Sequence, residues 1–135
     1  HQFVNPSFTV NTEEADVFSF CTVDYFENFP TFLKNTLKVM EEMLTNPSME
    51  DEEHRDDYLF LSAIPWVSFT SFSHAMHYTP ADSVPRMTWG KYFEQGDKIL
   101  MPLSVQAHHA VVDGRHTGKY FQLFQEYMRQ PESVL

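Results

Sequence analysis

The stretch His108-His109-Ala110-Val111-Val112-Asp113-Gly114 stands between an alternating apolar run and an amphipathic segment. Such a junction is typical of a strand that turns into a helix. Gly114 permits a sharp backbone turn, and Asp113 stands where a helix N-cap belongs. A free imidazole titrates near neutral pH, with an unperturbed pKa of about 6.5. The pattern therefore predicts a strand-to-helix corner that carries a candidate general base, His109.

The run before this corner predicts a strand over residues 98–109, paired with a strand over 87–93 through a hairpin turn at 94–97. One face of the later strand would carry Ile99, Met101, Leu103, Val105 and Ala107. If the extended conformation continues, His109 falls on that same apolar face. We expect this placement to desolvate the ring and lower its pKa, which would keep it neutral and ready to accept a proton.

The N-terminal half predicts two strands and a helix. Residues 8–10 and 17–23 are rich in β-branched and aromatic side chains, as strands are. Asn28 and Pro30 then supply helix-start signals, and Asn46-Pro47 supplies a stop, so we predict a helix over about residues 30–45. Its expected apolar stripe consists of Leu33, Leu37, Met40 and Leu44. The acidic residues 46–57 are expected to form a solvated loop.

The remaining segments complete the predicted fold. Residues 58–73 have the composition of a long strand that Pro65 interrupts. A second helical stripe, expected to pack on the sheet, consists of Thr117, Tyr120, Phe121, Phe124 and Met128. The order of elements predicts an α/β two-layer sandwich with a mixed, largely antiparallel sheet, formed as a single domain by residues 1–135.

Composition excludes several classes of function. The formal charge of −10 argues against nucleic-acid binding, because neutralising phosphates requires clustered Lys and Arg. No apolar run approaches the roughly 20 residues of a membrane span, and no signal segment opens the chain. Cys21 is the single cysteine, so we expect neither an intrachain disulfide nor a thiolate metal site. These features favour a cytoplasmic protein that binds neither membranes nor nucleic acid.

The corner motif taken alone is compatible with three interpretations. His108, His109, Asp113 and His116 could ligate a metal, but neighbouring residues on a strand point to opposite faces and do not converge on one ion. Alternatively, both histidines are hydrogen-bonded interior residues and Asp113 caps the following helix. The third interpretation is that His109 is a general base. Of these three interpretations, we reject the metal site and keep the other two.

The motif with its neighbours resembles the chloramphenicol acetyltransferases. His108-His109-x-x-x-Asp113-Gly114 alone also resembles dihydrolipoamide acyltransferase cores and peptide-synthetase condensation domains. Further segments, at matching spacings, favour the first family: Ser62-Ala63-Ile64-Pro65-Trp66-Val67, Phe69-x-Ser71-Phe72, Thr88-x-x-Lys91-Tyr92, Gly96-Asp97 and Pro102-Leu103-Ser104-Val105-Gln106. The resemblance extends over nearly the whole chain.

This resemblance implies a chemical role for four residues. His109 would abstract the proton from a primary hydroxyl of chloramphenicol, so that the oxygen attacks the thioester carbonyl of acetyl-CoA. Ser62 would donate a hydrogen bond to the oxyanion of the tetrahedral intermediate. Thr88 would hold a water near that intermediate. Asp113 would be structural and would hold the surroundings of the base in place.

The resemblance also implies binding residues. Lys91 and Tyr92 would contact CoA, which is a co-substrate and not a permanently bound cofactor. Phe18 and Phe72 would line the chloramphenicol site. Arg86 departs from the family, which usually has an aliphatic residue beside the acceptor pocket. If its side chain enters the pocket, the acceptor would differ from chloramphenicol.

The family comparison further implies that the chain is the C-terminal portion of its domain. The absent part would supply some of the acceptor pocket, some of the CoA site and an arginine that pairs with Asp113. Family members are homotrimers whose active sites lie between subunits. We therefore expect a chloramphenicol O-acetyltransferase. The alternatives are an acyltransferase for another small alcohol, or a fragment that binds ligands or assembles without turnover.

Overall fold

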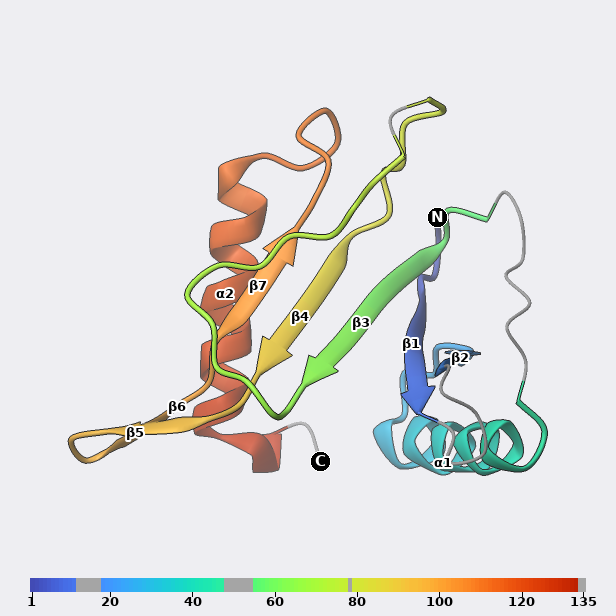
Figure 1. Ribbon diagram of the computed structural model, residues 1–135, viewed down its shortest axis with the longest axis horizontal. Coiled ribbons are helices and arrows are strands. Elements are labelled where there is room, and N and C mark those ends of the chain that lie inside the picture. The colour runs from blue at the N-terminus through green and yellow to red at the C-terminus, as the bar shows by residue number, and fades with distance from the viewer. Residues whose placement is uncertain (12–17, 48–54, 78, 134–135) are drawn as a thin grey trace.

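The computed structural model describes residues 1–11, 18–47, 55–77 and 79–133. Within these ranges the chain forms an α/β arrangement of strands and two long helices (Figure 1). Most of the acidic loop expected over 46–57 lies outside the described residues. The elements in chain order are β1 (Asn5–Asn11), β2 (Phe18–Thr22), α1 (Phe29–Thr45), β3 (Tyr58–Ile64), β4 (Arg86–Gly90), β5 (Phe93–Gln95), β6 (Lys98–Leu100), β7 (Leu103–Gln106), α2 (Gly114–Arg129) and the 3₁₀ helix η1 (Pro131–Ser133).

The main sheet is mixed, as the sequence predicted. Among the described residues it has five strands in the order β2-β1-β3-β4-β7. The inner pairings, β1 with β3 and β3 with β4, are parallel. The outer pairings, β1 with β2 and β4 with β7, are antiparallel. The predicted α/β class is confirmed, although this sheet contains parallel and antiparallel pairings in equal number rather than a majority of antiparallel ones.

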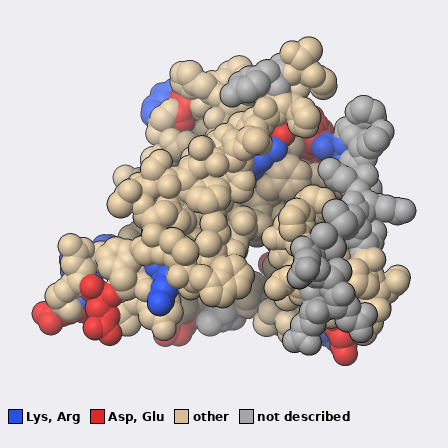
Figure 2. Space-filling view, in the orientation of Figure 1, with Lys and Arg blue, Asp and Glu red and all other residues tan. Residues whose placement is uncertain are grey.

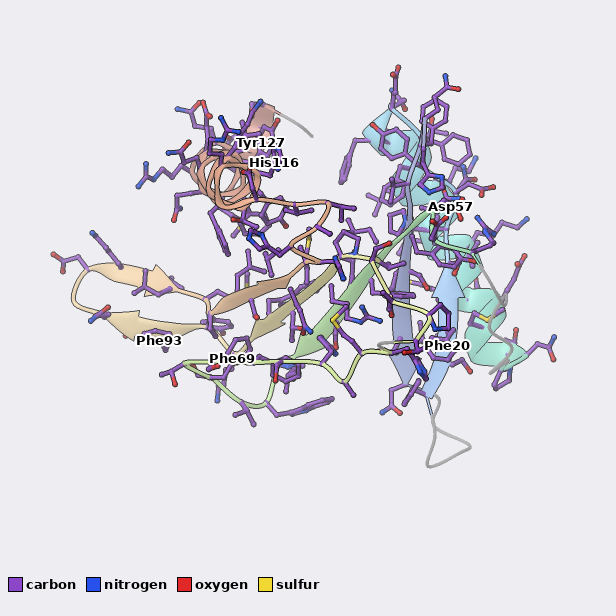
Figure 3. The ribbon with its side chains drawn as sticks, turned by 90° about the horizontal axis from the view of Figure 1, so that it is seen from above. Phe20, Asp57, Phe69, Phe93, His116 and Tyr127 are labelled. Atoms are coloured by element: carbon purple, nitrogen blue, oxygen red, sulfur yellow. The ribbon has the colours of Figure 1, made fainter. Side chains whose placement is uncertain are left out.

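Helix α1 packs at the β1–β2 end of the sheet, as Figures 1 and 3 show. Asn28 is its N-cap and accepts a hydrogen bond from the Thr31 backbone at 3.0 Å, which confirms the predicted start to within one residue. The small core at this end consists of Val10, Cys21 and Val23, against which α1 places Phe32, Val39, Met40 and Met43.

The predicted apolar stripe of α1 is largely wrong as a packing face. Leu33, Leu37 and Leu44 are exposed, and only Met40 of that stripe packs on the core. Periodicity identifies an apolar side of a helix but not which neighbouring residues of that side contact the sheet. The apolar surface of α1 is therefore wider than the part of it that contacts the sheet in the described residues.

Helix α2 lies at the opposite end of the sheet, beside β4 and β7 (Figure 3). The Tyr120 hydroxyl lies 2.9 Å from the Met87 sulfur on β4, and this contact joins the helix to the sheet. Thr117, Tyr120 and Phe124 of the predicted stripe are half-buried, whereas Phe121 and Met128 are exposed. The stripe is therefore confirmed in its central part only.

The C-terminal strands are shorter than the sequence predicted. The strand expected over residues 58–73 ends at Ile64, directly before Pro65. In place of the two strands expected over 87–93 and 98–109, the structure has four shorter ones. β4 and β7 join the main sheet, while β5 and β6 form a separate hairpin. Gly96, at a φ of 60°, forms the tight turn of that hairpin.

Gly90 explains how the segment after β3 crosses close to β4. A Cβ atom at this position would lie 2.7 Å from the Val67 carbonyl oxygen and 2.9 Å from the rings of Phe69 and Pro102. Glycine thus allows an irregular segment to pass over the end of the strand. Figure 1 shows this segment, which connects β3 to β4, running back across the sheet.

The surface of the described residues is uncharged over much of one face. Figure 2 shows charged side chains gathered towards the margins, including the end that carries the β5–β6 hairpin, around a largely uncharged middle. In the part of the chain that the structure describes, no helix is long and apolar enough to cross a bilayer.

Candidate functional site

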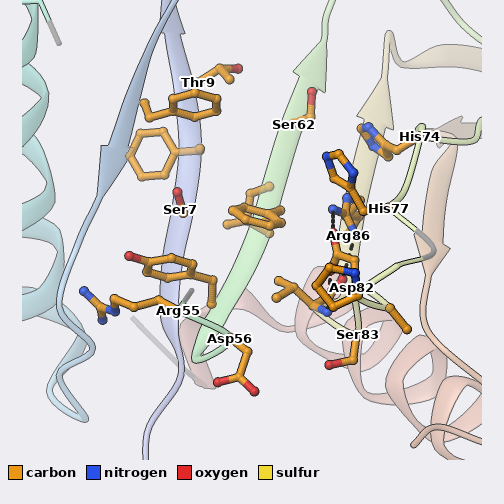
Figure 4. Close-up of a pocket in the computed structure, with 18 of the residues that line it drawn as sticks. Ser7, Thr9, Arg55, Asp56, Ser62, His74, His77, Asp82, Ser83 and Arg86 are labelled. Atoms are coloured by element: carbon orange, nitrogen blue, oxygen red, sulfur yellow. Dashed lines mark hydrogen bonds and ion pairs between the residues drawn. The ribbon is translucent and has the colours of Figure 1, made fainter. Parts of the chain in front are cut away.

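A cleft of about 1030 Å³ opens on the face of the sheet away from α2 (Figure 4). Alternation along the strands creates this face. Met87 contacts α2, so its neighbours Arg86 and Thr88 point to the other side. On β3 the residues Tyr58, Phe60 and Ser62 point into the cleft in the same way. Residues of β1 and β2 line the cleft on the far side of β3, and residues of the irregular segment that precedes β4 line it next to β4.

Ser62 and Thr88 lie side by side in the sheet. They are direct partners in the parallel β3–β4 ladder, so both side chains project from the same face. Ser62 is half-buried and lines the cleft, whereas Thr88 is only 1% exposed. The structure thus brings together two of the residues that the sequence singled out for catalysis.

Arg86 projects into the cleft and does not turn outward to solvent. Its guanidinium forms an ion pair with Asp82, donates to the Val84 carbonyl at 3.1 Å and lies 5.2 Å from the centre of the Phe60 ring. Burial raises the pKa of the Asp82 carboxyl, but the hydrogen bond from Arg86, the Val84 backbone N–H and the Arg86 charge outweigh it and lower this pKa overall. The cleft therefore contains a largely buried ion pair where an aliphatic wall was the family expectation.

His109 lies in a turn outside the cleft. The strand ends at Gln106, and the backbone N–H groups of Val111 and Val112 both donate to the His108 carbonyl at 3.0 Å. His109 is consequently exposed, and the expectation that it lies on the apolar face of an extended strand is wrong. No hydrogen bond joins it to Ser62 or Thr88 within the described residues.

The turn gives the two adjacent histidines different proton positions. Nδ1 of His109 lies 3.3 Å from the Val112 carbonyl oxygen, which can only accept, so Nδ1 carries the proton. Nε2 of neutral His109 is then left with its lone pair free. In contrast, Nδ1 of His108 accepts from the Ala110 backbone N–H at 3.2 Å, which uses its lone pair inside the turn. In this tautomer, Nε2 of His109 is available to accept a proton, whereas the Nδ1 lone pair of His108 is used in a hydrogen bond that stabilises the turn.

Asp113 caps α2, as the sequence predicted. Its carboxylate accepts from the backbone N–H groups of Arg115 at 2.8 Å and His116 at 3.3 Å, and the His116 ring accepts from the Asp113 backbone N–H to complete a capping box. The Arg115 N–H, followed by the Arg115 side chain and His116, lowers the pKa of Asp113. Within the described residues, Asp113 hydrogen-bonds to neither His108 nor His109.

The four predicted binding residues are placed differently. Phe18 on β2 lines the cleft. Phe72 is half-buried outside its lining and contacts Phe69 and His74. Lys91 and Tyr92 follow the end of β4 and are exposed, at the start of the β5–β6 hairpin and outside the cleft lining.

The cleft residues that sequence reasoning missed include His74 and Asp82. His74 Nε2 lies 2.7 Å from the Thr88 hydroxyl, and Asp82 pairs with Arg86. Asp82 stands four positions before Arg86, a spacing that could have suggested a local ion pair. Nothing in the sequence around His74 points to Thr88. In the described residues, no group of three or more His, Cys, Asp or Glu side chains is arranged to hold a metal ion.

Two solved acetyltransferase structures have a similar arrangement of strands and helices. A chloramphenicol acetyltransferase structure matches with a TM-score of 0.69 over 90% of this chain and 60% of its own, at 18% identity. A structure of Azotobacter vinelandii dihydrolipoamide acetyltransferase matches with a TM-score of 0.70 over 99% of this chain and 57% of its own, at 14% identity. The fold is that of the CoA-dependent acyltransferases.

Sequence comparison identifies the family. The chloramphenicol acetyltransferase family model matches residues 1–125, and the chain belongs to this family. The chloramphenicol acetyltransferase of Clostridium perfringens is 39% identical over 98% of this chain, and chloramphenicol acetyltransferase 3 of Escherichia coli is 36% identical over 91%. The chain spans 61% and 58% of the lengths of these two relatives. The resemblance found in the sequence is thereby confirmed.

Proposed function

We propose that the protein containing this chain is a cytoplasmic acetyltransferase that moves the acetyl group of acetyl-CoA to a primary hydroxyl of chloramphenicol. Residues 1–135 would then form the C-terminal portion of a single acyltransferase domain. The proposal is supported by the chain's membership of the family together with a cleft that Ser62 lines. Thr88, buried beside the cleft, is the partner of Ser62 in the β3–β4 ladder. In the fold neighbour from Azotobacter vinelandii, a serine and a histidine were investigated for roles in the catalytic mechanism.

The proposed reaction begins with His109. Its free Nε2 takes the proton of the acceptor hydroxyl, and the oxygen forms a bond to the thioester carbonyl carbon. Ser62 donates to the resulting oxyanion, and Thr88 holds a water beside it. The tetrahedral intermediate then expels the sulfur of CoA, which takes the proton back from His109. The acetyl group passes directly between substrates, so Ser62 is not a nucleophile.

Lys91 and Tyr92 are proposed to bind CoA. Both are exposed beyond the end of β4, where Lys91 offers positive charge to a phosphate and Tyr92 offers a ring face for stacking. Phe18, inside the cleft, is proposed to contact the acceptor. Phe72 would support it indirectly, because it packs against His74 at the cleft wall.

We further propose a homotrimer with active sites between subunits. Ser62 lines the cleft, whereas His109 is exposed in a turn outside that lining. A base that belongs to the adjacent copy would complete each cleft without any rearrangement of the turn. The same symmetry would repeat the site at every interface of a closed ring.

One observation favours an acceptor other than chloramphenicol. The Arg86–Asp82 ion pair lines the cleft and places charge and hydrogen-bonding groups where an apolar acceptor would lie. The alternative function is therefore acetylation of another, more polar small alcohol. The chemistry at His109 and Ser62 would be unchanged.

The test is an assay of the full-length protein for thiol release from acetyl-CoA, with chloramphenicol and a panel of small alcohols as acceptors. Release that depends on chloramphenicol supports the first function, and release only with a more polar alcohol supports the second. Affinity for acetyl-CoA without release to any acceptor would contradict both and would leave a binding or assembly role.

A further inference from the structure

His74 belongs to an irregular segment that β7 holds in place. The Gln106 side-chain oxygen accepts from the His74 backbone N–H at 2.7 Å, and the Gln106 nitrogen donates to the His74 carbonyl at 3.3 Å. Two residues earlier, the Phe72 carbonyl accepts from the Ser104 hydroxyl at 3.1 Å. Residues 72–74 are thus fixed to a strand 32 positions further along the chain.

The ring of His74 is directed at Thr88. Nε2 lies 2.7 Å from the Thr88 hydroxyl oxygen, and the Phe72 ring packs edge-on against the imidazole with centroids 4.9 Å apart. Because Thr88 is 1% exposed, this hydrogen bond is shielded from water on its threonine side. Both partners are held by the sheet or by its side chains, so the contact has a fixed geometry.

The surroundings of His74 favour a neutral ring. The charged or titratable side chains that line the cleft with it are Arg86 on β4, His77 and Asp82 on the irregular segment, and Arg55, Asp56 and Tyr58 at the start of β3. Burial lowers the pKa of His74, and the positive charge of Arg86 lowers it further. A neutral imidazole carries one proton, and its position decides the direction of the hydrogen bond to Thr88.

A hydroxyl has a single proton, so its donor role depends on its neighbour. If Nε2 of His74 is unprotonated, the Thr88 hydroxyl donates its proton to Nε2. The Thr88 oxygen can then only accept hydrogen bonds from other groups. If Nε2 is protonated, it donates to the Thr88 oxygen, and the Thr88 proton is free to point towards the cleft. Ser62 donates to a developing oxyanion in either case, but Thr88 can donate towards it, through the water that it is proposed to hold, only in the second arrangement. In that arrangement the His74 N–H and the Thr88 O–H form a chain of donors that polarise each other.

We propose that His74 is a positioning residue, which donates through Nε2–H to Thr88 and thereby directs the Thr88 proton towards the reacting centre. This role rests on the proposed acyl-transfer function. It acts through Thr88 and requires no contact between His74 and substrate. It also gives the irregular segment 72–74 a chemical purpose in addition to closing the cleft.

The first experiment reads the tautomer directly and needs no activity. Nitrogen NMR of the full-length protein labelled with ¹⁵N-histidine, with His74 assigned by loss of its signals in His74→Leu, should show the Nε2–H form. The His74 signals should shift in Thr88→Val. An Nδ1–H tautomer, or signals indifferent to Thr88→Val, would overturn the proposal even if the protein is a fully active acetyltransferase.

The second experiment is a kinetic cycle on the full-length protein with the acceptor that it acetylates. His74→Leu should lower kcat about tenfold, less than the loss of a direct oxyanion donor, with little change in KM. His74→Gln is the matched variant, because its side-chain nitrogen can reach the position of Nε2 and should keep kcat near wild type. In a Thr88→Val background, His74→Leu should cause no further loss.

Additive effects of His74→Leu and Thr88→Val would overturn the proposal, since His74 would then act independently of Thr88. Thermal unfolding of each variant separates a lost hydrogen bond from a lost fold. If the wild-type protein acetylates no acceptor, the proposed function fails while the NMR experiment still decides the bond between His74 and Thr88.

Discussion

Nδ1 of His109 lies 3.3 Å from the carbonyl oxygen of Val112, and this relationship leaves Nε2 as the free nitrogen of the ring. The neighbouring His108 has the opposite arrangement, because its Nδ1 accepts from Ala110. Two identical side chains in sequence are therefore distinguished by the hydrogen bonds of one turn. Only His109 has its lone pair directed out of the turn and available for a proton.

Replacement of His109 should strongly reduce acetyl transfer, whereas a matched change at His108 should not. His109→Ala removes the proposed base and should reduce kcat by about 10²–10⁴-fold. His108→Asn keeps a side-chain acceptor for the Ala110 N–H and should retain most activity. Thiol release by the full-length variants measures both. Equal losses in the two variants would contradict the assignment of the base to His109.

Mixed oligomers should restore activity that two single variants lack. Ser62→Ala removes the proposed oxyanion donor and should lower kcat about 10²–10³-fold. Ser68→Ala, at an exposed position outside the cleft lining, serves as its control. If base and cleft belong to different copies, unfolding and refolding His109→Ala with Ser62→Ala in equal amounts should recover about a quarter of wild-type sites by random assembly in a closed ring. Recovery of only the summed residual activities would place both residues in one copy.

Removal of the cleft ion pair should change acceptor preference. The double variant Arg86→Leu/Asp82→Leu replaces the pair with apolar side chains, a change that buried ion pairs often tolerate. KM for chloramphenicol should fall about tenfold, equivalent to roughly 1.4 kcal/mol, with kcat little changed. If the natural acceptor is a more polar alcohol, its KM should rise in the same variant. An unchanged KM for every acceptor would mean that the pair does not face substrate.

The same ion pair should contribute to stability in a pH-dependent manner. Because the pKa of Asp82 is lowered in the folded protein, its contribution is complete above the unfolded-state pKa of about 3.9 and is lost as pH falls through the folded value. Asp82→Asn should therefore lower the unfolding temperature at pH 7, and the difference from wild type should shrink below about pH 4. A difference that is constant from pH 7 to pH 3 would contradict this linkage.

Asp113 should behave as a helix cap and not as a charged partner of the base. Asn caps helices about as well as Asp, so Asp113→Asn should reduce activity and unfolding temperature less than Asp113→Ala. Thermal unfolding and thiol release on both full-length variants measure the comparison. If Asp113→Asn and Asp113→Ala lose activity equally while both remain folded, the negative charge itself is required.

Local signals in the sequence predicted the helices well. Asn28, Pro30 and Pro47 bracket α1, and the observed start differs by one residue from the prediction. Asp113 and Gly114 likewise placed the start of α2. Capping depends on residues within one turn of the helix end, so the information is contained in the adjacent sequence.

Long-range contacts account for what the sequence did not reveal. The packing face of α1 depends on β1 and β2, so Leu33 and Leu37 looked equivalent to Met40 although they are exposed. The contact of His74 with Thr88 requires Gln106 to fix the intervening segment. The exposure of His109 follows from a turn that ends β7 earlier than its alternating pattern implied.

The capping box at the start of α2 joins the turn of His109 to the helix and not to the wall of the cleft. The residues that distinguish the cleft wall, Arg86 with Asp82 and His74, all lie on β4 or on the segment before it. In the proposed enzyme, substrate range and proton transfer would therefore depend on separate segments of the chain. Such a division would let an enzyme lineage exchange one acceptor for another by altering a single wall, and it would offer the same freedom to protein engineers.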